Sequence, residues 1–450
     1  MNKILMNHKF SIANLLIAAV FFSSCTKVLD LEPAQSLSND VALSSDEGVK
    51  QVLNAAYDEI SLEDLYGGNI MRNSELYGGE GEVIWLGTYI GPQEIFNRAI
   101  LVTNTDVEYF WDEAYNAINI CNNVLTALDV VDEADRARVE GEAKFIRGAL
   151  YFELVRYFGQ QYKPGTPNEQ LGVPLVLKPS ENAEDNSAVS RNTVEEVYAQ
   201  VIGDLSDAKD LLPEKNSVYA TTYMASAILS RVYLQQENYE GARDEADRVI
   251  ASGKFKLVAN YADEFGQDEN TTEDIFSIQV STQDGINAMN LYFSTALNGG
   301  RGDVQVEQSF LDSYDPDDLR KDLYYKVGGK WRTGKFNNEF GNVTVVRLAE
   351  MYLIRAECNA RLGTQVGAAP VDDYNKSHTR AGLDAAASVT LDDILTERRF
   401  ELAHEGQKVF DVKRLHGTVG TMPFDDVKMV FPIPQREIQV NPNLEQNPGY

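Results

Sequence analysis

Residues 221–252 read TTYMASAILSRVYLQQENYEGARDEADRVIAS, and this stretch indicates the fold. It contains two helical patterns, 221–236 and 239–252, separated only by Glu237 and Asn238. Small and bulky side chains stand where the two helices of a tetratricopeptide unit interlock, at Ala227, Leu229, Tyr233, Tyr239, Ala242, Ala246 and Ile250. The stretch therefore predicts a helical hairpin that stacks on other hairpins of its kind.

Other parts of the chain repeat this helical pattern. Three Ser/Thr-x-x-Glu capping boxes, at Ser44–Glu47, Thr105–Glu108 and Thr193–Glu196, stand ahead of apolar residues spaced one or two turns apart. We expect helix pairs within three ranges, 105–158, 193–252 and 345–405. The predicted fold is mostly α, a tetratricopeptide-like superhelix of about four helix pairs.

Two intervals, 61–104 and 253–343, do not fit the helical pattern. They are rich in Gly and aromatic residues, as in Trp85-Leu86-Gly87-Thr88-Tyr89, and the second contains a strand-like piece, Ile275 to Val280. Long structureless intervals inside a compact domain are usually functional loops. We expect both to be irregular, Gly-rich ligand-binding insertions with a few short strands, and we expect 406–450 to form a C-terminal strap.

The N-terminus has the pattern of an export signal. Lys3 and Lys9 precede an apolar run from Ile12 to Phe22, which is too short to cross a bilayer as a helix. Small residues directly before Cys25 resemble a lipobox, which predicts cleavage there and lipidation of this cysteine. An ordinary signal peptide with an incidental cysteine is the alternative. The predicted parts are a signal peptide at 1–24, a lipidated tether at 25–45 and one folded domain at 46–450.

The charge and the cysteine usage exclude several classes of protein. The chain has 69 acidic and 40 basic residues, and removing Lys3 and Lys9 takes the net charge from −29 to −31. So negative a surface repels phosphate backbones, which makes nucleic acid an unexpected partner. The lipid is the only membrane device that the sequence predicts. Cys121 and Cys358 lie inside helical patterns, which favours two buried, reduced thiols over a disulfide.

Catalytic and metal-binding patterns are missing from the sequence. It contains no G-x-S-x-G elbow, P-loop or dinucleotide-binding fingerprint, and its four histidines lack zinc-site spacing. The acidic run from Asp312 to Asp318 lacks the Gly and the terminal Glu of an EF-hand, so we expect it to pair with Arg320, with adventitious calcium as the alternative. The tripeptide Arg301-Gly302-Asp303 matches an integrin motif that recurs by chance. We therefore predict no cofactor, no resident metal and no enzymatic activity.

Five C-terminal segments carry a family resemblance: Arg347 to Glu357, Glu397 to Gly406, Phe410 to Arg414, Phe431 to Ile438 and Asn441 to Tyr450. Together with Cys25-x-x-x-Leu29-Asp30, they closely resemble the SusD/RagB family of Bacteroidota outer-membrane lipoproteins. The resemblance runs from Cys25 to Tyr450. It implies a lipid-anchored outer-membrane protein facing the cell exterior, which binds a glycan and acts as a lid on a TonB-dependent transporter of the SusC type.

The motifs that carry the resemblance look structural. We expect the charged residues of the predicted helix 391–405, Arg398, Arg399, Glu401 and Glu405, to pair with one another and with Asp411 and Arg414. Two alternatives to glycan binding stay open. RagB-like capture of peptides fits the same C-terminal motif, and a surface enzyme would need a pair of carboxylates in a cleft, which chance can supply among 69 acidic residues.

The two insertions contain side chains that suit sugar binding. Sugars present apolar C–H faces and hydroxyl edges, which match aromatic rings beside Asn, Asp and Arg. The candidates are Arg72, Asn73, Tyr77, Trp85, Tyr89 and Asn97 in the first insertion, and Tyr292, Arg301, Asp303 and Trp331 in the second. We expect Trp85 and Trp331 to be exposed on one shared face, and Trp111, on a helical stripe, to lie in the core.

Overall fold

The computed structural model describes residues 39–180 and 188–450. The predicted signal peptide, Cys25 and most of the predicted tether therefore lie outside the described residues. Within the described part of the chain, no helix has the length and apolar character needed to cross a membrane.

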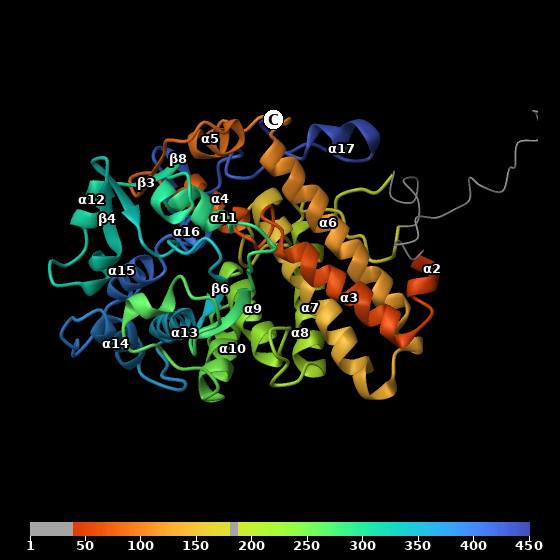
Figure 1. Ribbon diagram of the computed structural model, residues 1–450, viewed down its shortest axis with the longest axis horizontal. Helices are drawn as coiled ribbons and strands as arrows, with labels where there is room; N and C mark the ends of the chain where they lie inside the picture. The colour runs from red at the N-terminus through yellow and green to blue at the C-terminus, as the bar shows by residue number, and fades with distance from the viewer. Residues whose placement is uncertain (1–38, 181–187) are drawn as a thin grey trace, which may run out of the picture.

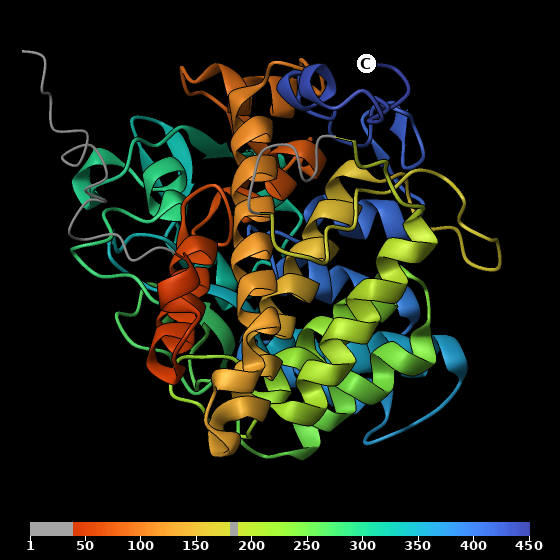
Figure 2. The same cartoon turned by 90° about the vertical axis from the view of Figure 1, so that its right-hand side faces the viewer.

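Long helices stack side by side in chain order (Figures 1 and 2). Each helix of this series packs on the next: α3 (Asp46–Ser61), α6 (Thr105–Thr126), α7 (Glu133–Phe158), α8 (Val194–Leu211), α9 (Thr222–Gln235), α10 (Tyr239–Ala251), α13 (Leu348–Leu362) and α14 (Pro370–Arg380). The predicted mostly helical, tetratricopeptide-like fold is confirmed, and the hairpin of the opening stretch is α9–α10.

Shorter elements fill the rest of the described chain. The helices are α2 (Asn39–Ala42), α4 (Asn69–Gly78), α5 (Ile90–Asn97), α11 (Ala288–Phe293), α12 (Gln308–Asp312), α15 (Leu391–Glu401), α16 (Lys408–Arg414) and α17 (Gln435–Val440). The 3-10 turns are η1 (Leu128–Val130), η2 (Tyr261–Glu264), η3 (Ala296–Asn298) and η4 (Leu319–Leu323). The strands are β1 (Val83–Trp85), β2 (Asp274–Ile278), β3 (Val304–Val306), β4 (Tyr324–Val327), β5 (Lys330–Thr333), β6 (Val343–Arg347), β7 (Thr418–Val419) and β8 (Met422–Pro423).

Helix α7 is the centre of the core. Every residue from 145 to 159 is buried, because helices and the C-terminal strap cover this half of α7 on all sides. The strap is fixed to the end of α7 by hydrogen bonds: Phe431 N donates to Tyr157 O at 2.8 Å, and Asn447 Nδ2 donates to Phe158 O at 2.8 Å. Trp111 is 3% exposed and packs on Phe158 with ring centroids 4.9 Å apart, as expected of a core residue.

The strands of the described residues form three small antiparallel sheets, two of which join parts of the chain that are far apart in sequence. The largest has the strand order β1-β3-β5-β4, so it connects the two predicted insertions. Val83 of β1 lies opposite Val306 of β3, which in turn lies opposite Trp331 of β5. Strand β2 covers most of the strand-like piece predicted at 275–280, and it pairs with β6.

The helix starts confirm one capping prediction and correct two. Thr193 forms the expected capping box with Glu196. Helix α3 is capped by Ser45, whose extended backbone lets its side chain accept from Gly48 N, and not by Ser44. Helix α6 is likewise capped by Asn104, one residue before the predicted Thr105.

The prediction that 61–104 is irregular is wrong, because this interval contains α4 and α5. Every residue of α4 is buried, so the helix has no solvent-exposed face, and four consecutive polar residues, 72–75, interrupt the apolar spacing from which a helix is predicted. Gly78 allows the close approach that buries it, since a Cβ there would lie 2.6 Å from the Cα of Val409 in α16. The predicted strap at 406–450 also contains regular structure, namely α16, α17 and the β7–β8 hairpin.

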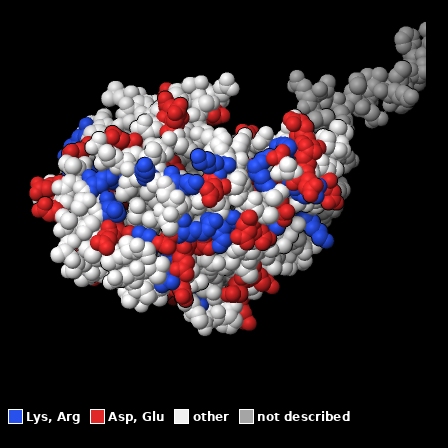
Figure 3. Space-filling model, turned by 90° about the horizontal axis from the view of Figure 1, so that it is seen from below, with Lys and Arg blue, Asp and Glu red and all other residues white. Residues whose placement is uncertain are grey.

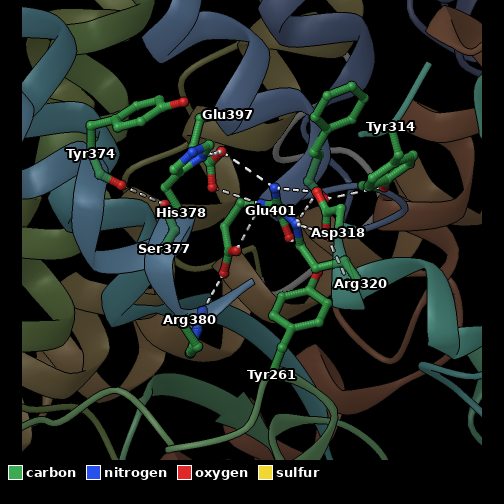
Figure 4. Close-up of polar contacts among 12 residues, drawn as sticks. Tyr261, Tyr314, Asp318, Arg320, Tyr374, Ser377, His378, Arg380, Glu397 and Glu401 are labelled. Carbon is green, nitrogen blue, oxygen red and sulfur yellow. Dashed lines mark hydrogen bonds and ion pairs between the residues drawn. The ribbon is translucent and has the colours of Figure 1, made fainter. Parts of the chain in front are cut away.

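Buried ion pairs fix the C-terminal family motif (Figure 4). Arg320 lies between Asp318 and Glu397, at 2.7 Å from each, which confirms that the acidic loop pairs with Arg320. The expected pairs of Asp411 with Arg398 and Arg414 form at 2.9 and 2.7 Å. The expectation that the charged residues of the predicted helix 391–405 pair with one another is wrong. Glu401 and Glu405 reach Arg347 of β6 instead, and Arg399 reaches Glu82.

The structure also shows how the surface charges are distributed and whether the two cysteines are free. Basic and acidic side chains are interspersed on the face seen in Figure 3, so the acidic excess forms no single patch there. Cys121 and Cys358 are both buried and free, as expected. Burial raises the pKa of the Cys121 thiol to about 12, which keeps it protonated. Among the described residues, no group of His, Cys, Asp or Glu side chains has the arrangement of a metal site.

Candidate ligand-binding site

The pairing of β1 with β3 brings the two predicted insertions together. Trp85 lies opposite Val304, and the ladder extends one residue further because Leu86 N donates to Asp303 O at 2.7 Å. The turn 86–89, which enters α5, therefore lies beside residues 301–303, although about 215 positions separate them in the sequence. This junction carries most of the predicted ligand-binding residues.

Tyr292 of α11 is the centre of a group of aromatic side chains at the junction. Its ring centroid is 5.8 Å from that of Trp85 and 6.3 Å from that of Tyr89. Tyr89 is 45% exposed, whereas Tyr292 and Trp85 are each 6% exposed. Burial raises the pKa of Tyr292 to about 12, so its hydroxyl stays protonated and can both donate and accept hydrogen bonds. The exposed ring of Tyr89 thus contacts the buried ring of Tyr292, which in turn packs on the buried ring of Trp85.

Arg301 forms the polar rim of this surface. Its guanidinium carbon lies 4.2 Å from the ring centroid of Tyr89, and its Nε lies 2.7 Å from Asp303 Oδ2. Its Nη2 also donates to Thr88 Oγ1 at 3.3 Å. The hydrogen bond to Asp303 raises the pKa of Arg301, so the guanidinium remains charged. An exposed ring bordered by a guanidinium, a carboxylate and a hydroxyl has the apolar and polar parts that a sugar ring requires.

Below this rim, two buried hydrogen-bond donors have no partner among the residues that the structure describes. Arg72 lies 4.3 Å from the ring centroid of Tyr292, and its Nη2 reaches Asn73 Oδ1 at 2.8 Å and the carboxylate of Asp106. Its Nη1 is unpaired, and so is the indole Nε1 of Trp85. A buried donor without a partner costs about 1–3 kcal/mol, so such groups need an explanation. Both N–H groups are themselves buried, so a ligand on the surface does not reach them in this conformation of the site.

Seven of the ten predicted residues meet at this junction. We name them the Tyr292 cluster; they are Arg72, Asn73, Trp85, Tyr89, Tyr292, Arg301 and Asp303. Most of them are buried, which corrects the expectation of an exposed Trp85: this side chain lies on the inner face of its strand with Val83, which is 1% exposed. Tyr89 and Arg301 are the exposed members.

The other three predicted residues lie outside the cluster. Tyr77 is fully buried, donates to Val430 O at 3.1 Å and packs on Phe431, so it is a core residue. Asn97 is exposed at the far end of α5, about 12 Å along the helix from Tyr89.

Trp331 is on the same sheet as Trp85, two strands away and therefore about 10 Å across the sheet. It is only partly exposed. Its Nε1 donates to Gln308 at 2.7 Å, and Lys326 Nζ lies 4.5 Å from its ring centroid. The indole N–H is thus already paired, and the side chain is less exposed than that of Tyr89, which argues against a sugar platform at Trp331.

Strongly exposed apolar side chains in the two predicted insertions were not among the predicted site residues. Leu297 is 83% exposed, Ile90 70% and Leu101 57%. Leu297 precedes the Asn298-Gly299-Gly300 turn and Ile90 begins α5, so an apolar residue beside a Gly-rich turn was the available signal. Exposed apolar patches commonly mark interaction sites.

Three surface cavities lie elsewhere. One of about 510 Å³ is bounded by α15 and α16, and one of about 540 Å³ lies between α6 and α17. A third, of about 640 Å³, borders the ion pairs of Figure 4 and is lined by Asp315, Asp317 and Asp384. None of these three cavities is lined by a residue of the Tyr292 cluster.

Comparisons with known proteins match both halves of the chain to related families. Residues 27–234 match a SusD-like family described as "Starch-binding associating with outer membrane", and residues 319–422 match the SusD family. The SusD-like protein P38 of Formosa agariphila is 26% identical, with 97% of this chain and 98% of the relative covered.

Solved structures of this family are similar over most of the chain. A SusD superfamily protein from Bacteroides thetaiotaomicron has a TM-score of 0.81 at 26% identity, covering 90% of this chain and all of the other. A laminarin-binding SusD-like protein has a TM-score of 0.75 at 25% identity, with the same coverage.

Proposed function

Because the chain is a member of the SusD/RagB family, we propose that it binds oligosaccharides at the cell surface and delivers them to a TonB-dependent outer-membrane transporter of the SusC type. Members of this family are carbohydrate-binding proteins and not enzymes, and the chain has no catalytic role. The laminarin-binding relative of the same fold supports a glycan as ligand.

The Tyr292 cluster is the observation that carries the proposal. The exposed ring of Tyr89 gives a sugar an apolar surface, and Arg301, Thr88 and Asp303 offer hydrogen-bonding groups at its edge. The buried side chains of Tyr292, Trp85 and Arg72 pack beneath this surface. All of these groups lie on rigid elements, α4, β1, α5, α11 and β3, or on the short turns that join them.

The membrane anchor and the transporter partner are further parts of the proposal. The lipobox-like sequence before Cys25 supports a lipid anchor, and the exposed Leu297, Ile90 and Leu101 support contact with a protein partner. In the Cys25→Ser protein we expect export without extraction into the membrane fraction. Labelling of that variant by a palmitate analogue would contradict the assignment of the anchor.

Affinity electrophoresis and calorimetry test the ligand. We expect the mature protein to be retarded by at least one of laminarin, starch, mannan and galactan. Tyr89→Ala should weaken the binding of that glycan about tenfold, since a platform contact is worth about 1–2 kcal/mol. Tyr109→Ala is the matched control, because Tyr109 is 52% exposed on α6 outside the cluster. Binding of peptides from a casein digest, with no glycan bound, would favour the RagB-like alternative.

A further inference from the structure

Arg301 and Asp303 neutralise each other within the candidate site. The Nε–Oδ2 distance of 2.7 Å is that of a charge-assisted hydrogen bond, and the side chains are 33% and 9% exposed. The two charged residues of the Arg-Gly-Asp tripeptide therefore form an ion pair with each other, and neither charge is available to a ligand. An adhesion motif needs both charges to be available, so the tripeptide does not act as one. The same ion pair leaves the cluster without an unpaired charge that could bind a charged ligand.

The other arginines near the cluster are buried and present no exposed cation. Arg72 is fully buried and contacts the carboxylate of Asp106. Arg332 is 5% exposed and donates to the carbonyl oxygens of Gly302 and Val304, at 3.0 and 2.9 Å. No uncompensated cation is therefore presented on the exposed part of the Tyr292 cluster, and the chain as a whole has a net charge of −29.

We propose, resting on the proposed function, that Asp303 makes the site selective for uncharged glycans by holding Arg301. A sugar with a carboxylate or a sulfate would have to take Arg301 away from Asp303 and then stay beside that carboxylate. Breaking one charge pair to form another brings no net gain, and like charges at close range repel. A neutral sugar meets neither cost.

The surroundings of Asp303 keep it in place. A Cβ on Gly87 would lie 2.7 Å from Cγ of Asp303, so the two residues pack closely, and Asp303 O accepts from Leu86 N. Asn has nearly the shape of Asp and fits the same space without the charge. Asp303→Asn therefore leaves Arg301 charged and without its carboxylate, at a position where water can still solvate it.

A pair of matched polysaccharides tests the proposal by calorimetry. One is the neutral glycan that retards the wild type most, from the set of laminarin, starch, mannan and galactan. The other is the same glycan oxidised at its C6 hydroxyls to carboxylates. We expect the wild type to bind the oxidised form at least about tenfold more weakly, and Asp303→Asn to reduce this ratio to about threefold or less.

Two observations distinguish a change in selectivity from a structural effect of Asp303→Asn. A merely structural role of Asp303 would weaken both affinities and leave their ratio unchanged, and the gain for the oxidised form should disappear at 500 mM salt. Asp58→Asn, at an exposed position of α3, makes the same change in net charge and should leave the ratio at the wild-type value.

Equal binding of both forms by the wild type, or the same ratio in Asp303→Asn, would refute the selectivity while the glycan-binding function stands. Failure of the wild type to bind any of the four neutral glycans would refute the proposed function, and this inference with it.

Discussion

Lys413 of α16 is a buried base without an acidic partner. It is 2% exposed, its Nζ donates to Arg156 O at 2.8 Å, and it forms no ion pair with any described residue. Burial, together with the nearby charge of Arg156, lowers its pKa from 10.5 to about 7. Each tenfold change in a proton equilibrium corresponds to about 1.4 kcal/mol, so carrying the charged form in the core costs about 5 kcal/mol below pH 7.

Linkage gives the sign of the pH dependence. Between pH 7 and 10.5 the unfolded chain keeps the Lys413 proton and the folded chain does not, so the unfolded state binds more protons and this residue makes stability rise with pH. Lys413→Met removes the titration and keeps a side chain of similar length. It loses one hydrogen bond, worth about 1 kcal/mol.

We therefore expect Lys413→Met to raise the free energy of unfolding by about 3–4 kcal/mol at pH 6, and by about 2–3 kcal/mol less at pH 9. Urea unfolding followed by fluorescence at pH 6, 7, 8 and 9 measures the difference. Lys330→Met, at an exposed hairpin position, should show no pH-dependent difference. A Lys413→Met protein that is less stable than the wild type at pH 6, or whose difference does not change with pH, would refute the reasoning.

Two further predictions concern stability. Arg347 lies within 2.8 Å of Glu273, Glu401 and Glu405, and Arg347→Met removes this shared cation. We therefore expect the free energy of unfolding, measured in urea, to fall by about 3–5 kcal/mol. Lys254→Met breaks only an exposed pair with Glu214 and should change stability far less; equal losses in the two variants would contradict this account of the buried pairs. Gly78→Ala should lower the thermal unfolding midpoint, because its Cβ would lie 2.6 Å from the Cα of Val409. Gly203→Ala, at an open position in α8, should raise it, since Ala favours a helix by about 1 kcal/mol; the same sign for both would contradict the packing argument.

The long helices could be predicted because their apolar residues recur at helical spacing, whether the helix has a solvated face, as α10 has, or is buried nearly throughout, as α9 is. The opening stretch 221–252 shows this. No end of its two helices differs from the predicted position by more than one residue. Helix α4 could not be found in this way, because four consecutive polar residues, 72–75, interrupt its apolar spacing although all of them are buried. Helix α14 was missed as well, since its sequence PVDDYNKSHTR is polar nearly throughout.

The residues of the candidate site could be predicted from the sequence, but the burial of each side chain could not. Aromatic and polar residues in two Gly-rich intervals were enough to select the Tyr292 cluster, because β1–β3 pairing joins those intervals. The burial of each side chain depends on which face of a strand or helix it occupies, and in strands of three residues the alternation is too short to show it. Trp85 and Tyr89 were therefore indistinguishable in the sequence, although one is buried and the other exposed.

The C-terminal family motif and the candidate site are linked through α4. Glu75 of α4 accepts from Gly406 N at 2.9 Å, just after α15, and Gly78 lies against Val409 of α16. The same helix carries Arg72, which packs on the ring of Tyr292. The motif that identifies the family thus contributes no residue to the Tyr292 cluster, but it fixes the helix on which the cluster is built. This explains how a structural motif at one end of the chain supports a ligand surface formed by residues far from it in sequence.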